Sequence, residues 1–318
     1  MRARYILLIL LAIAAPFFIY PTFLMKVLCF ALFATAFNLL LGFGGLLSFG
    51  HAAFFGGAAY ICATVVQQWG LTPELGILAG ALYALVLGAI FGWIAVRRAG
   101  IYFAMITLAL SQLIFFLALQ LPFTGGEEGI QGVPRGRLFG VLDLSDNLAM
   151  YFFVLAVCAA GFWLIHRTIH SPFGHALTAI RENEPRAISL GYDVSRYKLL
   201  AFILSATMAG VAGALKSLVF QLATLTDVHW HMSGQVVLMT IVGGLGTILG
   251  PAVGALTIVS LENQLADRVG SWVTVIMGAI FVLCVMLFRR GIVGEFNAWR
   301  ETRRRRSARG SSGPTDAP

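Results

Sequence analysis

Ten apolar segments, separated by short polar or glycine-rich stretches, leave little room for any fold except a bundle of membrane-crossing helices. A span needs about 20 mostly apolar residues, although buried or broken segments can be shorter. The chain has 59% hydrophobic and 11% charged residues, whereas an ordinary soluble domain carries about 25% charged residues. We therefore expect an all-α, polytopic membrane protein with about ten transmembrane or half-spanning helices. The expected segments are 5–20, 26–47, 51–67, 75–96, 101–121, 148–165, 198–220, 233–245, 248–262 and 272–288.

Lysine and arginine gather on one side of these segments. Most of the 22 basic residues lie before the first segment, at 97–98, in the polar stretch 167–198 and after residue 288. Because positively charged loops stay in the cytoplasm, we expect both termini there. The pattern predicts a single transmembrane domain over 1–290 and a basic, disordered cytoplasmic tail over 291–318. The tail's arginines should face anionic membrane lipid, and no nucleic acid is expected as a partner.

Two glycine-rich stretches, Gly42–Gly50 and Val242–Pro251, interrupt the apolar segments. Glycine weakens a helix and proline removes a backbone donor, so both stretches should break their helices. Because Lys198 and Arg289 are both expected in the cytoplasm, 233–262 must leave the membrane on the side where it entered. It should form a hairpin of two short helices or a re-entrant loop.

Such glycine breaks have two explanations. Paired broken segments mark translocation pathways, because freed backbone groups line the route. Small residues also allow close helix packing, and both explanations can hold together. The candidate pathway residues are Gly44, Gly45, Ser48, Gly50, His51, Gly243, Gly244, Gly246 and Thr247.

The polar stretch 167–198 is long for a connection between spans. Its run AIRENEPRAISLG is compatible with a helix that ends at Gly191. A structured, charged element on one side of a membrane protein suggests contact with a driving partner, and an exposed charged loop is the alternative. The candidate contact residues are Arg181, Glu182, Asn183, Glu184, Arg186, Ala187 and Gly191.

The chain lacks the residues of several chemical mechanisms. It has no GxxxxGK[ST] phosphate loop, so it should not hydrolyse ATP by that route. All 14 acidic residues fall in expected loops, tails or segment edges, whereas proton-coupled transporters usually keep a carboxylate within a span. Lys216 should either reach the outer interface or contact a substrate carboxylate. The cysteines lie in separate apolar segments, as buried thiols do, and neither a metal nor a cofactor is expected.

Several stretches, in this order and spacing, resemble the LivM-type permease of branched-chain amino acid ABC importers. The resemblance runs over roughly 26–290. It rests on LGFGGLLSFGHAAFFGGAAY (41–60), GIYFAMITLA (100–109), TGGEEGIQGVP (124–134), GHALTAIRENEPRAISLGYDVSRYKLLAF (174–202), SATMAGVAGAL (205–215) and GGLGTILGPAVGA (243–255).

The resemblance implies a transport subunit of the bacterial inner membrane with a fold similar to type II ABC importers, and not an enzyme. Its implied partners are a second permease, cytoplasmic ATP-binding subunits that dock on 167–198, and a periplasmic solute-binding protein. The outer loop Thr124, Gly125, Gly126, Glu127 and Glu128 would face the binding protein, and solvated loop charge is the alternative explanation for its two glutamates. A urea or short-chain amide importer is the alternative substrate class. An ion-coupled secondary transporter and a membrane-embedded enzyme are alternatives of other classes.

Overall fold

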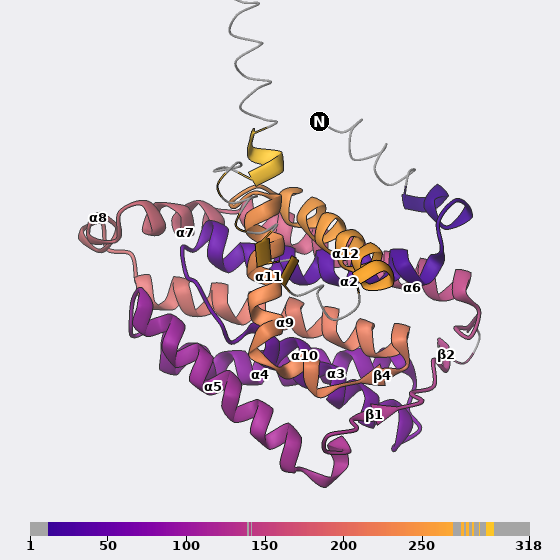
Figure 1. The fold of residues 1–318 in the computed structure, drawn as a ribbon. Helices are drawn as coiled ribbons and strands as arrows, with labels where there is room; N and C mark the ends of the chain where they lie inside the picture. Colours follow the sequence, from indigo (N-terminus) through magenta and orange to yellow (C-terminus); the bar gives the residue numbers. More distant parts are fainter. Residues whose placement is uncertain are drawn as a thin grey trace, which may run out of the picture.

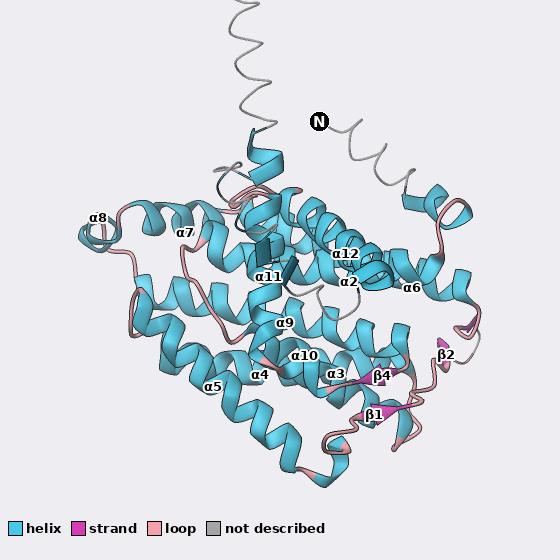
Figure 2. Cartoon of the chain, in the orientation of Figure 1, coloured by secondary structure: helices cyan, strands magenta, loops and turns pink. Residues whose placement is uncertain are grey.

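The computed structural model describes residues 12–138, 140, 142–269, 275–276, 278–279, 282, 286 and 291–295 (Figure 1). Helices dominate these residues, and the strands are short pieces at one end (Figure 2). The helices are α2 (Pro21–Asn38), α3 (His51–Gln67), α4 (Pro73–Ala95), α5 (Ile101–Gln120), α6 (Asn147–Ile169), α7 (Pro172–Glu182), α8 (Glu184–Ser189), α9 (Val194–Phe220), α10 (Leu225–Val228), α11 (Trp230–Gly243) and α12 (Gly250–Val269). Shorter elements are the 3-10 turns η1 (Ala15–Phe17) and η3 (Pro122–Thr124), the π-helical turn η2 (Leu39–Phe43), and strands β1 (Ile130–Gln131), β2 (Arg137–Leu138), β3 (Leu142–Asp143) and β4 (Leu222–Ala223).

Eight of the ten expected segments correspond to described helices, so the all-α, polytopic membrane fold is confirmed. Among the described residues, five helices are long and apolar enough to cross a membrane: Pro21–Phe43, Pro73–Ala95, Ile101–Gln120, Asn147–Ile169 and Val194–Phe220. Residues 5–11 of the expected segment 5–20, most of 272–288 and most of the tail 291–318 lie outside the described residues.

Burial separates central helices from peripheral ones. Within the most apolar windows, 78% of α2 and 61% of α9 are buried, against 28% of both α4 and α5. The peripheral helices expose large apolar side chains such as Leu78, Trp93 and Phe116. A bilayer accepts such a surface, because lipid tails are as apolar as these side chains. Helices α2 and α9 therefore form the protein core, and α4 and α5 present their outer faces to an apolar surrounding.

Small residues bring the core helices into close contact. A Cβ added at Gly213 of α9 would overlap the backbone carbonyl of Phe55 in α3, and one added at Gly210 would overlap Ala84 of α4. In a bilayer, where hydrophobicity contributes little to helix association, such close packing supplies much of the attraction. The glycines of SATMAGVAGAL therefore position α9 against α3 and α4.

The bundle has two distinct ends (Figure 1). Helices α7 and α8 lie at one end, on the left of the view, and the paired strands β1 and β4 lie at the other. Helices α11 and α12 form a hairpin whose break packs near the α7–α8 end, while Glu262 of α12 approaches Lys26 at the start of α2. The stretch 233–262 therefore contains two helices that pack against each other around the expected break.

Candidate functional site

The two glycine breaks, some 200 residues apart in sequence, meet at the side chain of Asn38. Its Nδ2 donates to the carbonyl of Thr247 at 2.8 Å, and its Oδ1 accepts from the backbone N–H of Gly246 at 3.0 Å. Asn38 ends α2 and precedes the π-helical turn η2, which carries Gly42. A Cβ at Gly42 would overlap both Asn38 and the Gly246 nitrogen. The first break and the hairpin therefore form one packed unit.

Arg181 of α7 reaches this unit from the α7–α8 end. Its Nη1 donates to the carbonyl of Gly42, and its aliphatic stem lies against Gly45. Gly45 has φ of 68°, a left-handed conformation that favours glycine, and a Cβ there would overlap the arginine stem. The predicted contact residue Arg181 and the predicted pathway glycines thus belong to a single cluster. We call Asn38, Gly42, Gly45, Arg181, Gly246 and Thr247 the glycine junction.

Ser48 and His51 lie in a buried hydrogen-bond chain that joins α2, α3 and α9. Ser205 donates to the carbonyl of Ala36 at 2.6 Å, so its oxygen accepts from His51 Nε2 at 2.8 Å. The other ring nitrogen, Nδ1, then accepts from Ser48 at 3.2 Å, and Ser48 accepts from the N–H of Gly50. One neutral tautomer satisfies every group. His51 has no exposed surface in this conformation, so its role in lining a pathway stays a prediction.

An apolar cavity of about 450 Å³ lies beside the first break. One wall comes from the stretch after η2 and the other from the start of α5. Its lining residues are Gly45, Leu46, Leu47, Phe49, Gly100, Ile101, Phe103 and Ala104, none of which carries a polar side chain. The side chains around the cavity therefore offer no hydrogen-bonding group to a molecule that enters it.

The run 179–191 is two helices, which corrects the expectation of one. Asn183 is extended, with φ of −154°, and its side chain accepts from the N–H of Arg186 as the N-cap of α8. Pro185 has no N–H to continue the helix from α7, whereas a missing N–H is tolerated in the first turn of α8, where Pro185 lies. The end at Gly191 is confirmed: this glycine has φ of 86°, as helix C-termini commonly require.

The charged residues of α7 and α8 do not all face outward. Glu184 pairs with the buried Lys198 of α9 at 2.8 Å, and Ala187 packs with Ile180 and Val194. Only Glu182 and Arg186 remain as exposed charges without an internal role. Sequence reasoning missed two large apolar side chains on the same element. Ile188 is 58% and Leu190 is 69% exposed, and the signal for them was an apolar pair within a polar, helical stretch.

At the strand end, the predicted outer loop forms a tight turn. Gly125 and Gly126 both have positive φ, and Thr124 is buried, with its hydroxyl donating to the carbonyls of Ala118 and Leu121. Glu127 and Glu128 are exposed. The loop therefore presents two carboxylates on a backbone whose shape the glycines permit.

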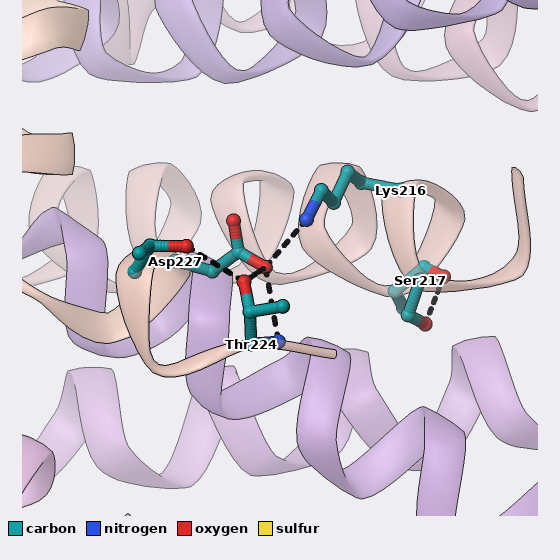
Figure 3. Close-up of polar contacts among 6 residues, drawn as sticks. Lys216, Ser217, Thr224 and Asp227 are labelled. Atoms are coloured by element: carbon teal, nitrogen blue, oxygen red, sulfur yellow. Dashed lines mark hydrogen bonds and ion pairs between the residues drawn. The ribbon is translucent and has the colours of Figure 1, made fainter. Parts of the chain in front are cut away.

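The structure pairs Lys216 with a buried aspartate, an arrangement that neither expected role of this lysine included. Its Nζ binds Asp227 Oδ2 at 2.5 Å, and the two side chains are only 11% and 3% exposed (Figure 3). The same Asp227 oxygen accepts from the backbone and the hydroxyl of Thr224. Asp227 lies between two expected segments, yet it is buried, because 221–232 folds inward as β4, α10 and the start of α11.

Metal and thiol chemistry find no support in the part of the chain that the structure describes. That part holds no group of three histidine, cysteine or acidic side chains able to bind a metal ion. His166 and His170 stack at the end of α6 with ring centroids 4.2 Å apart. Cys29, Cys62 and Cys158 are buried free thiols, as expected.

Comparison with known proteins agrees with this architecture. The model of a family described as branched-chain amino acid transport system, permease component, matches residues 19–285. The high-affinity branched-chain amino acid transport system permease protein LivM of Escherichia coli is 26% identical over 312 residues, covering 90% of this chain and 73% of that protein. LivM of Salmonella typhimurium is 25% identical, covering 80% of this chain and 65% of that protein, slightly under two thirds of its length.

Sugar-related permeases are also similar. The ribose import permease protein RbsC of Bacillus subtilis is 28% identical, covering 57% of this chain and 58% of that protein. No solved structure matches the chain. The family model covers well over half of the residues and includes both glycine breaks, α7, α8 and the α11–α12 hairpin. This multi-pass membrane protein therefore belongs to the family of branched-chain amino acid transport system permeases.

Proposed function

We propose that the chain is a permease subunit of an ABC importer for branched-chain amino acids, driven by ATP hydrolysis on a separate subunit. The observation that carries the proposal is the family match over 19–285. The absence of a phosphate loop agrees with it, because ATP hydrolysis by that route must then take place on another chain. The transmembrane domain spans 1–290 in this proposal, with 291–318 as a basic cytoplasmic tail.

The ATP-binding subunit docks on the α7–α8 end, which we assign to the cytoplasm from its basic residues. Ile188 and Leu190 support this assignment, since exposed apolar side chains on a polar element mark interaction sites. Glu182 and Arg186 supply a charged rim around them. An apolar centre with a charged rim is the usual anatomy of a protein interface.

The solute pathway runs beside the glycine junction. The apolar cavity beside Gly45 favours the side chains of leucine, isoleucine and valine. Ribose importers among the relatives define the main competing substrate class, and urea or short-chain amides remain a further alternative. A second permease subunit completes the pathway, and a periplasmic binding protein meets the strand end through the loop 124–128.

Co-purification and reconstitution test this function together. The tagged chain is isolated from native membranes in mild detergent, its partners are identified by mass spectrometry, and the complex is reconstituted in liposomes. We expect ATP-dependent uptake of labelled leucine and no uptake of ribose or urea. Uptake of ribose or urea would show that the substrate is not a branched-chain amino acid. Uptake by the chain alone under an ion gradient would establish a secondary transporter instead of an ABC importer.

The docking surface has its own variant. Ile188→Asp combined with Leu190→Asp should lower co-purification of the ATP-binding subunit at least tenfold, because it places two carboxylates at an apolar contact. Leu71→Asp is the matched control, since Leu71 is an exposed apolar residue that connects α3 and α4, away from α8. Undiminished co-purification and uptake in the double variant would move the docking site elsewhere.

A further inference from the structure

We propose that Arg181 is the positioning residue that transmits movement of α7 to the two glycine breaks. The inference rests on the proposed docking role of α7 and α8, and it adds the residue through which docking acts on the pathway. Arg181 lies on the last turn of α7, directly before the exposed helix α8. Its guanidinium reaches the Gly42 carbonyl, 139 residues away in sequence.

Close packing connects Gly42 to the break between α11 and α12. Asn38 uses its amide nitrogen and its amide oxygen on the α11–α12 break, at Thr247 and Gly246. Gly42 lies close enough to both Asn38 and Gly246 that no Cβ would fit there. A displacement of the Gly42 peptide must therefore displace the hairpin break as well.

The junction is built from backbone that can change shape. A π-helical turn such as η2 has a weaker hydrogen-bond pattern than an α-helix and frequently marks a functional site. Gly45, Gly244 and Gly246 all have positive φ, and glycine can leave that region without a steric barrier from Cβ. Movement of α7 can therefore be taken up by conformational changes at these glycines, because the segment is not a continuous α-helix.

The arginine contact is also suited to repeated breaking. A charged guanidinium bound to a carbonyl makes a stronger hydrogen bond than a neutral donor does. Within the described part of the chain, no carboxylate forms an ion pair with Arg181, and the residue is exposed. Release therefore exposes the guanidinium to water without leaving a buried charge unpaired.

The apolar cavity lies on the same segment. Gly45 contacts the Arg181 stem on one side and lines the cavity on the other. Movement of Arg181 would therefore change the cavity wall directly. Glu184, by contrast, holds α8 to Lys198 of α9 and has no contact with the junction.

The experiment measures transport per ATP hydrolysed in the reconstituted complex. Arg181→Met keeps an apolar stem and removes the donor. We expect it to retain the ATP-binding subunit and ATP hydrolysis, and to lower uptake per ATP at least tenfold. Arg181→Lys restores a shorter positive donor and should recover part of the loss. Arg196→Met is the control, because Arg196 is exposed and pairs only with Asp193.

Two outcomes separate this inference from the proposed function. Loss of the ATP-binding subunit from the wild-type complex would defeat the proposed function itself. A complex that assembles and transports normally with Arg181→Met would defeat only the inference. If Arg181→Met does not yield a monodisperse complex, Arg181→Gln replaces it, since glutamine is polar and too short to reach Gly42. Normal uptake per ATP in the variant that folds would again overturn the role of Arg181.

Discussion

Replacing Asp227 with asparagine should strongly destabilise the protein, because it leaves the Lys216 ammonium buried without its carboxylate. The pair is 2.5 Å apart, with side chains 11% and 3% exposed. At an effective dielectric constant of 20, two unit charges at that distance attract with about 7 kcal/mol, and desolvation offsets much of this attraction. Removing one partner of a buried pair costs about 3–5 kcal/mol, since the remaining charge keeps its desolvation cost.

A double-mutant cycle of Lys216 and Asp227 measures how strongly the two side chains stabilise each other. Lys216→Met should cost about as much as Asp227→Asn, again about 3–5 kcal/mol. The combined variant contains no buried charge, and asparagine can still accept the bonds from Thr224. We therefore expect it to be more stable than the sum of the single effects by at least about 2 kcal/mol, as coupled neighbours are.

Thermal unfolding in detergent, followed by fluorescence-detected size exclusion, measures these differences. At about 2–4 °C per kcal/mol, each single variant should lower the apparent Tm by about 6 °C or more. All variants must be heated at one rate, because membrane proteins of this size often unfold irreversibly. Lys26→Met is the control: its pair with Glu262 spans 3.8 Å with side chains 25% and 35% exposed, and such a pair contributes less than about 1 kcal/mol.

Additive single effects, each smaller than that of Lys26→Met, would refute this account of the pair. A loss of proton-driven uptake without a loss of stability would contradict the proposed ABC importer function. If Asp227→Asn leaves the Tm unchanged but abolishes uptake driven by a proton gradient, Asp227 is a proton-binding carboxylate, and the chain is a secondary transporter.

Two further predictions concern the contacts of α9. Gly213→Ala should reduce the yield of folded protein severely, because the added methyl group would overlap the Phe55 carbonyl. Gly234→Ala should be tolerated, since there is open space around Gly234. Size-exclusion profiles of both variants measure the yield of folded protein. Ser205→Ala should cost about 1–3 kcal/mol, measured as a fall in Tm of several degrees, because it leaves buried polar groups unpaired. Thr207→Val should have little effect on the Tm, since the Thr207 hydroxyl donates to Ile203 of its own helix. An equal fall in Tm for Ser205→Ala and Thr207→Val would contradict the hydrogen-bond chain through Ser205 and His51.

The helical segments and their breaks could be predicted because they depend on local properties. A bilayer requires long apolar helices, so hydropathy locates α4, α5, α6 and α9 within a few residues. Glycine and proline mark where a helix cannot continue, and both expected breaks are present. Charge placement and the glycine-rich break at Val242–Pro251 together predicted either a hairpin or a re-entrant loop for 233–262, and the structure has two packed helices there, α11 and α12.

The break between α7 and α8 illustrates a local signal that was present but undervalued. Asn183 and Pro185 together favour a new helix start at Glu184, although the composition of the whole stretch is compatible with one helix. Ile188 and Leu190 are two apolar residues among charged ones, and only the structure shows that both are exposed. The pairing of Glu184 with Lys198 of α9 had no local signal, because it joins side chains of different helices.

The sequence by itself determined the class of protein, the order of its helices and the positions of its flexible breaks. Each of these depends on a short stretch of chain, because a bilayer requires apolar helices and because glycine and proline interrupt them. Only the tertiary structure decided that Asn38 binds Thr247, that Arg181 reaches Gly42, and that Asp227 is buried against Lys216. These pairings depend on how helices distant in sequence pack, and hydropathy says nothing about which polar groups such packing brings within hydrogen-bond distance.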